Sequence, residues 1–311
     1  MTLARRYAGL VGLSAVLLVF SEFVFLNEGV VAPLLTGEDG FGALLQTGEM
    51  LLFYLLFGAI FAAVVSAYGA ATVPALLLAG AICGWGIEAV LVPLVYEAVP
   101  YSLAWPSLGW HMLIDVAVGL FLLPALLAAR SRLVAVTLLV FIGLLWGAWA
   151  SWIWIEDLRP TPWRFAVFAA VVIALLAAGY ALLGWAGADA FSFGRRERAT
   201  IGIIAVALGA VTGSPYMPWP LIVAALAGLA LLALARGARR RRGFGRLPLA
   251  ERRLPPARLA LLALVAPTAT LSYAWMYAGT RMIEVDLIAA PLMLAGTVIF
   301  LWALLREFTR A

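Results

Sequence analysis

Hydrophobic residues fill long stretches of the chain, and about ten of these stretches are long enough to cross a lipid bilayer as helices. The hydrocarbon core of a bilayer requires about 20 apolar residues of helix. The pattern therefore predicts an all-α, polytopic transmembrane bundle of about ten spans. We place these spans near residues 10–34, 44–68, 72–96, 108–129, 133–155, 164–186, 199–214, 219–235, 259–279 and 287–305.

Three prolines lie between the seventh and eighth spans, at Pro215, Pro218 and Pro220. A helix does not continue through such a segment, because proline lacks the backbone N–H and clashes with the preceding turn. The two spans form either a complete hairpin or a re-entrant pair buried in protein. We favour the hairpin because it agrees with the distribution of charge.

Arginines are strongly biased toward one side of the predicted topology. Arg5 and Arg6 place the N-terminus in the cytoplasm, following the positive-inside rule. An even number of spans then brings the C-terminus to the same side, and all of the 21 basic residues except Arg159, Arg164 and Arg281 become cytoplasmic. We therefore predict a multi-pass plasma-membrane protein with both termini in the cytoplasm.

Composition excludes several other classes of protein. The chain is 65% hydrophobic and 12% charged, whereas soluble domains contain about 25% charged residues. The net charge of +5 does not indicate nucleic-acid binding, because many arginines cluster in one connection between apolar segments, at 236–258. Basic loops of this kind fix topology or contact anionic lipid. The expected partners are the bilayer and anionic lipid at this loop, and the oligomeric state stays open.

One cysteine, Cys83, and one histidine, His111, restrict the cofactors that a single chain can hold. Intrachain disulfides, cysteine-based zinc sites and iron–sulfur clusters all need more cysteines. Haem held by two histidines needs a second histidine. We expect none of these groups, and the sequence requires no cofactor.

A short internal repeat divides the N-terminal half of the chain. Glu28 and Pro33 recur sixty residues later as Glu88 and Pro93, each pair at the outer end of a predicted span. Parallel copies of a helical hairpin occur in transporter folds, although a match this short also arises by coincidence. The resulting division is a six-span part at 1–186, with possible copies at 10–68 and 72–129, and a four-span part at 187–311.

Most tryptophans fall near the predicted outer boundary of the membrane. We interpret them mainly as an interfacial belt, where indole rings sit well at headgroup level. Because few tryptophans mark the inner boundary, an outer pocket lined by aromatic rings is the alternative. The residues are Trp105, Trp110, Trp149, Trp152, Trp154, Trp163, Trp219 and Trp275.

Five acidic residues and the single histidine lie within the outer half of predicted spans, and they are the candidate site. A carboxylate near the bilayer centre costs at least about 2.5–3.5 kcal/mol, so these groups should face the bundle interior, a partner or water. His111 and Asp115 are four residues apart and share one helix face. The hydroxyls of Tyr54, Tyr96 and Tyr101 are possible donors to this cluster. The candidates for binding substrate or protons are Glu28, Glu88, His111 and Asp115, with Glu22 and Glu49 behind them.

Three functions fit this pattern. A small transporter, proton-coupled or for a lipophilic or cationic solute, is favoured because intramembrane ionisable residues mark ion and substrate paths. The first alternative is an intramembrane enzyme that acts on a lipid or lipid-linked substrate at the outer leaflet. No catalytic residue is identified, Ser107 is a weak nucleophile candidate, and any metal would use Glu88, His111 and Asp115. The second alternative is a non-catalytic subunit in which the acids join helices by hydrogen bonds.

Overall fold

The computed structural model describes residues 2–37, 40–90, 93–129, 131–239 and 254–309, apart from the side chains of Glu28 and Asp189. These residues form helices joined by short connections, and they contain no strand. Long helices are expected because backbone N–H and C=O groups in lipid must be satisfied within the chain itself. The predicted all-helical class is thus confirmed for the described residues.

Among the described residues, ten helical segments are long and apolar enough to cross a membrane, in agreement with the predicted number. Several contain more than one helical element. The spans are Leu3–Val24 (α1, Leu3–Leu18; η1, Val19–Val24), Gly40–Tyr68 (α3), Val73–Val90 (α4), Tyr101–Ala128 (η3, Tyr101–Leu103; η4, Ser107–Leu122; α5, Leu123–Ala128), Arg132–Glu156 (α6, Arg132–Trp149; η5, Ala150–Glu156), Pro162–Ala186 (α7), Arg195–Tyr216 (α8, Arg195–Gly213; η7, Ser214–Tyr216), Trp219–Ala238 (α9), Pro256–Ala278 (α10, Pro256–Leu259; η8, Ala260–Leu264; α11, Val265–Ala278) and Asp286–Thr309 (α12). Shorter elements between spans are α2 (Glu28–Thr36), η2 (Pro93–Tyr96) and η6 (Ala188–Phe191).

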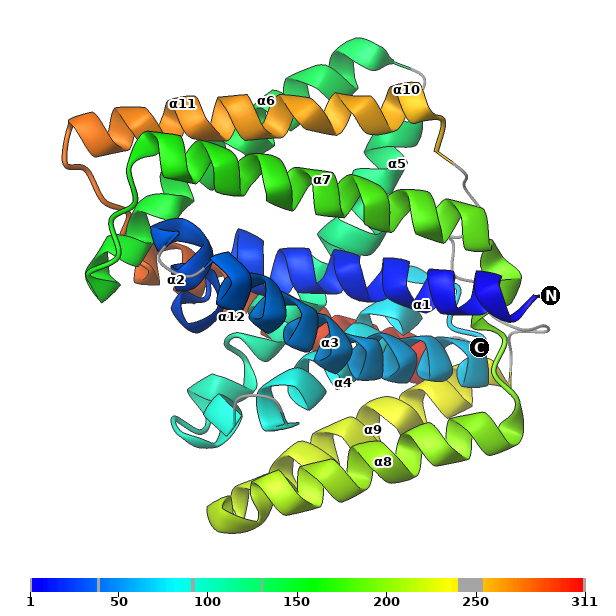
Figure 1. Ribbon diagram of the computed structural model, residues 1–311. Coiled ribbons are helices and arrows are strands. Elements are labelled where there is room, and N and C mark those ends of the chain that lie inside the picture. The colour runs from blue at the N-terminus through cyan, green and yellow to red at the C-terminus, as the bar shows by residue number, and fades with distance from the viewer. Residues whose placement is uncertain (1, 38–39, 91–92, 130, 240–253, 310–311) are drawn as a thin grey trace.

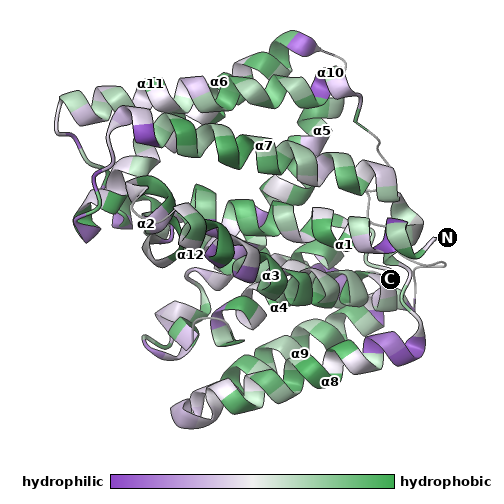
Figure 2. Cartoon of the chain, in the orientation of Figure 1, coloured by the Kyte–Doolittle hydropathy of each residue, from purple (hydrophilic) through white to green (hydrophobic). Residues whose placement is uncertain are grey.

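The helices are arranged around α1. Figure 1 shows α6, α7 and α11 on one side of α1 and α3, α4 and α12 on the other, with the α8–α9 hairpin beyond α4. Leu13, Leu17 and Leu18 of α1 are completely buried. Both termini lie at the same end of the bundle (Figure 1), as an even number of spans requires. Figure 2 shows apolar residues along the helices and hydrophilic residues mainly near their ends.

The α8–α9 pair agrees with the predicted hairpin. Each helix is long enough to cross a bilayer, and the two run side by side (Figure 1). The turn between them contains a 3₁₀ segment that begins at Ser214. The first of the three prolines, Pro215, lies in this segment. The basic connection that leaves α9 lies largely outside the described residues, at 240–253.

The first span is shorter than predicted, because its helix ends near Val24 instead of continuing to residue 34. Leu26 has a left-handed backbone conformation, with a φ of 67°. This conformation is uncommon for a residue other than glycine and breaks the helix. The chain then begins a separate helix, α2, at Glu28. A break at this depth frees backbone carbonyls that need other donors.

The packing of α6 against α11 depends on a glycine. A Cβ atom added to Gly147 would lie 2.7 Å from the carbonyl carbon of Ala269 and 2.9 Å from its Cα. Both separations are shorter than van der Waals contact. Small residues let transmembrane helices approach closely and gain dispersion energy along their length. Position 147 therefore admits only glycine unless the two helices separate.

We predict that Gly147→Ala lowers the thermal stability of the purified protein. Gly202→Ala is the matched control, because Gly202 also lies within a helix but has open space around it. Both changes gain the same helix propensity, about 1 kcal/mol, so a difference between them reports packing. The measurement is the melting temperature in detergent, and equal values for the two variants would contradict the prediction.

Candidate functional site

The candidate site centres on His111, whose two ring nitrogens each face a carboxylate. Nε2 lies 2.7 Å from Oε1 of Glu88, and Nδ1 lies 2.7 Å from Oδ2 of Asp115. All three side chains are buried. Each hydrogen bond requires one proton, and neutral histidine supplies only one. With two protons in place, the two carboxylates and the ring still have a net charge of −1, because one of the two negative charges is not balanced.

A chain of hydroxyl groups extends this arrangement to a third carboxylate. The hydroxyl of Tyr54 donates to Oε1 of Glu22 at 2.5 Å and also contacts Oγ of Ser21. Oγ of Ser21 lies 3.1 Å from Nδ1 of His111. Because hydroxyls both donate and accept, the hydrogen bonds are continuous. We call the connected set the buried polar cluster: Glu22, Tyr54, Ser21, His111, Asp115 and Glu88.

Two helical segments with π-type hydrogen bonding position most of the buried polar cluster. Ser21 and Glu22 lie on η1, and His111 and Asp115 lie on η4. The wider turn is visible in the bond from the backbone N of His111 to the carbonyl of Pro106, five residues earlier, at 3.1 Å. π-helical turns are rare and frequently occur at functional sites. The backbone is therefore specialised at the two segments that carry the polar groups.

Gly84 allows α4 to reach η4 closely enough for Glu88 to meet His111. A Cβ atom on Gly84 would lie 2.9 Å from the Cβ of His111. Glu88 follows one turn later on the same helix, so the close approach at Gly84 carries its carboxylate to the ring. A larger residue at position 84 would separate α4 from η4 and lengthen this hydrogen bond.

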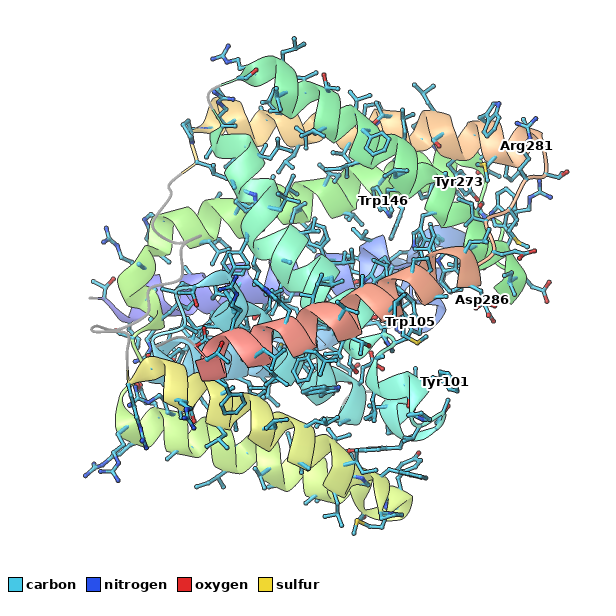
Figure 3. All side chains as sticks on the ribbon, turned by 180° about the vertical axis from the view of Figure 1, so that it is seen from behind. Tyr101, Trp105, Trp146, Tyr273, Arg281 and Asp286 are labelled. Atoms are coloured by element: carbon cyan, nitrogen blue, oxygen red, sulfur yellow. The ribbon has the colours of Figure 1, made fainter. Side chains whose placement is uncertain are left out.

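A cavity of about 400 Å³ adjoins the buried polar cluster. Ser21, Glu22, Glu88 and His111 line it, whereas Asp115 lies behind His111. The cavity opens to the surface between exposed residues of the chain before η4 and the start of α12. Figure 3 shows Tyr101, Trp105 and Asp286, which also line it, at the end of the bundle away from the termini.

Three carboxylate oxygens of the cluster have no hydrogen-bond partner among the described residues. They are Oε2 of Glu22, Oε2 of Glu88 and Oδ1 of Asp115, and each is buried. A buried carboxylate oxygen without a partner is costly. Glu22 and Glu88 line the cavity, so a proton, a water molecule or a positively charged group in the cavity can satisfy them.

Four buried tryptophans stabilise the break in the first span. Their indole N–H groups donate to backbone carbonyls near the start of η1, at its end and in the following turn, and at the end of η1 the helix no longer supplies donors. These rings are not at the lipid interface, so the interfacial-belt interpretation fails for them; it remains suitable for the exposed rings of Trp163 and Trp275. The pairs are Trp110 to Phe20, Trp146 to Val24, and Trp149 and Trp152 to Phe25, at 2.9–3.1 Å.

The structure brings together four of the six residues that the sequence suggested as a site. Glu22, Glu88, His111 and Asp115 belong to one hydrogen-bonded cluster. Glu49 does not join them, because its side chain is exposed on α3 and does not line the cavity. Glu28 begins α2, after the break, and its side chain lies outside the described part of the structure.

Sequence reasoning missed Ser21 and only partly anticipated the tyrosines. Tyr54 belongs to the cluster and Tyr101 lines the cavity. Tyr96 instead stacks on Tyr216, with ring centroids 5.2 Å apart. The available signal for Ser21 was its position beside Glu22 in an otherwise apolar stretch, because two adjacent polar residues in a span usually share an environment away from lipid.

Among the described residues, no group of three or more histidine, cysteine, aspartate or glutamate side chains is arranged to hold a metal ion. Glu88, His111 and Asp115 are adjacent, but both ring nitrogens of His111 are engaged by the carboxylates. A metal would have to displace one of these hydrogen bonds.

No known protein family matches the chain, and neither a curated protein nor a solved structure is significantly similar to it.

We predict that His111→Leu strongly destabilises the protein, because it leaves the carboxylates of Glu88 and Asp115 buried without a positive or donating partner. Breaking a buried ion pair by removing one partner typically costs about 3–5 kcal/mol. The measurement is the free energy of unfolding at neutral pH. A triple variant that adds Glu88→Gln and Asp115→Asn should recover much of the loss, since neutral amides need no counter-charge. Equal stability of the single and triple variants would contradict the prediction.

Proposed function

We propose that this chain is a small proton-coupled transporter, and that the cavity beside the buried polar cluster is its binding site. The supporting observation is the continuous hydrogen-bonded chain from Glu22 to Glu88: both side chains line one cavity, and each has a buried oxygen without a partner among the described residues. The cluster contains three carboxylates and one histidine, and no arginine lines the described cavity. Protons or a cation must therefore supply the missing positive charge.

The break in the first span supports this proposal. Transporters often bind substrate where a membrane helix is interrupted, because irregular backbone is tolerated where it lines a cavity. Here Phe25 and Asn27, within the break, line the cavity together with Glu22 from the preceding helix. The same segment thus contributes to the cavity, to the cluster and to the interruption of the helix.

Proton and solute movements would be coupled because the proton and the solute compete for the same negative charge. Glu88 hydrogen-bonds His111 through one oxygen, its other oxygen is buried without a partner among the described residues, and its side chain lines the cavity. A proton on this carboxylate and a positively charged or donating solute beside it would satisfy the same oxygen. Binding of one favours release of the other. The hydroxyls of Tyr54 and Ser21 would pass protons between Glu22 and the His111 pair by rotating and exchanging hydrogen bonds.

The side of the membrane that the cavity faces is inferred from the arginine bias of the sequence. With the arginine-rich end of the bundle in the cytoplasm, the cavity faces the outside of a plasma membrane. In the same orientation, Arg236 and Arg258, which flank the basic connection, would lie beside the cytoplasmic leaflet, where arginines attract anionic lipid.

The two alternative functions receive less support. For an enzyme, Ser107 is a poor nucleophile candidate, because its side chain is fully buried and does not line the cavity. Ser21 approaches Nδ1 of His111, the nitrogen that also binds Asp115, so the order of a serine–histidine–aspartate triad is absent from this cluster. For a purely structural subunit, we would expect every buried oxygen of the cluster to be satisfied.

The test is solute-dependent proton movement in liposomes that contain the purified protein and an entrapped pH-sensitive dye. The assay uses a mixed panel of anionic, neutral and cationic small organic solutes, so it does not presuppose a substrate. We expect at least one solute to drive a pH change, and Glu88→Gln to reduce its rate to that of empty liposomes, because the amide cannot exchange a proton.

Glu49→Gln is the matched control for this assay. Glu49 is an exposed acidic residue of a membrane span outside the cavity, and its replacement should leave the rate unchanged. Absence of proton movement with every solute class, or equal rates for Glu88→Gln and the unmodified protein, would refute the transport proposal.

A further inference from the structure

We infer that the cavity binds an organic cation, of the quaternary ammonium or protonated amine class; this inference rests on the proposed binding role of the cavity. Three features of the cavity support it: perpendicular aromatic rings, unpartnered carboxylate oxygens and an acidic mouth. Each feature comes from different residues, and the residues of all three line one cavity of about 400 Å³.

Aromatic rings form adjacent walls of the cavity. The ring of Phe25 meets that of Trp110 at 79°, with centroids 4.8 Å apart, and the ring of Trp105 meets Trp110 at 83°, with centroids 6.0 Å apart. All three rings line the cavity. An alkylated ammonium group is attracted to the negative face of an aromatic ring, so a ring face that borders the cavity favours such a group.

Carboxylates supply the charge that rings alone do not. Oε2 of Glu22 and Oε2 of Glu88 are buried, lack hydrogen-bond partners among the described residues, and belong to side chains that line the cavity. Glu22 is 3% exposed and Glu88 is 7% exposed, so water screens them poorly. A cation between these oxygens and the rings would be attracted from both sides.

The mouth of the cavity is also acidic. Exposed Glu97 and Asp286 line it, and they come from the chain before η3 and from the start of α12. Like charges around an opening raise the local concentration of ligands of the opposite charge. An anionic ligand would be repelled at the mouth and again by the buried carboxylates.

Other ligand classes fit less well. A small metal cation prefers a shell of oxygen ligands, and aromatic rings provide none. A neutral lipophilic solute would gain from the rings but would leave the carboxylate oxygens unsatisfied. The volume is in the range typical of sites for small organic molecules, so an organic cation with an apolar body uses all of the walls.

The experiment compares choline with its neutral isostere, 3,3-dimethylbutan-1-ol, which has the same shape but lacks the charge. Binding to the full chain in nanodiscs is measured at equilibrium and without a pH gradient. We expect choline to bind at least tenfold more tightly than the alcohol, and the larger cation benzyltrimethylammonium to bind more tightly than choline. If neither cation binds more tightly than the alcohol, the inference is overturned.

Variants test which walls are responsible. Trp105→Leu should weaken binding of benzyltrimethylammonium about tenfold, whereas Trp105→Phe, which keeps a ring, should retain most of the affinity. Trp163→Leu is the matched control, since Trp163 is exposed and lies outside the cavity. Equal effects of the leucine substitutions at positions 105 and 163 would contradict the proposed aromatic wall.

This outcome is separable from that of the transport test. A protein that binds the cations but moves no protons with any solute keeps the cation site and refutes transport. A protein that moves protons with neutral or anionic solutes, yet does not prefer choline over the alcohol, keeps transport and refutes the cation site.

Discussion

The hydrogen bonds between His111 and its two flanking carboxylates are the interaction on which the rest of this structure depends. Burying three acidic groups among apolar helices is costly, and one imidazole can balance only part of their charge. For the imidazole to balance this charge, Glu88 and Asp115 must both reach its ring, and this requirement affects how the surrounding helices pack. It explains why α4 approaches η4 at a glycine, and why the cluster ends at a cavity where the remaining charge can be met.

A second constraint is the need to satisfy backbone groups wherever a helix is interrupted at membrane depth. The break after Val24 is tolerated because indole N–H groups from η4, α6 and η5 replace the missing helical donors. The first span therefore depends on residues that follow it by about a hundred positions in the sequence. Because Ser21 and Glu22 of the buried polar cluster lie in the segment that these four indoles hold, a change in the indoles would also affect the cluster.

The sequence predicted the spans well and the site only in part. Long apolar stretches determine helices in lipid almost regardless of tertiary context, and the four-residue spacing of His111 and Asp115 correctly places both on one face. The partnership of His111 with Glu88 could be suspected from depth alone. The break at Leu26 and the π-type winding could not, because each arises from contacts between distant spans. Glu49 shows the opposite limit: depth in a span does not reveal which way a side chain points, and this one is exposed.

The buried indoles provide an intrinsic spectroscopic probe of the first span. The rings of Trp110 and Trp149 stack at 25° with centroids 5.7 Å apart, and Trp149 lies 5.8 Å from Trp152. Chromophores this close couple electronically, so the near-ultraviolet circular dichroism and intrinsic emission of the chain depend on the position of the segment that these rings hold. Rearrangement of the first span would thus be visible spectroscopically without any added dye or engineered probe.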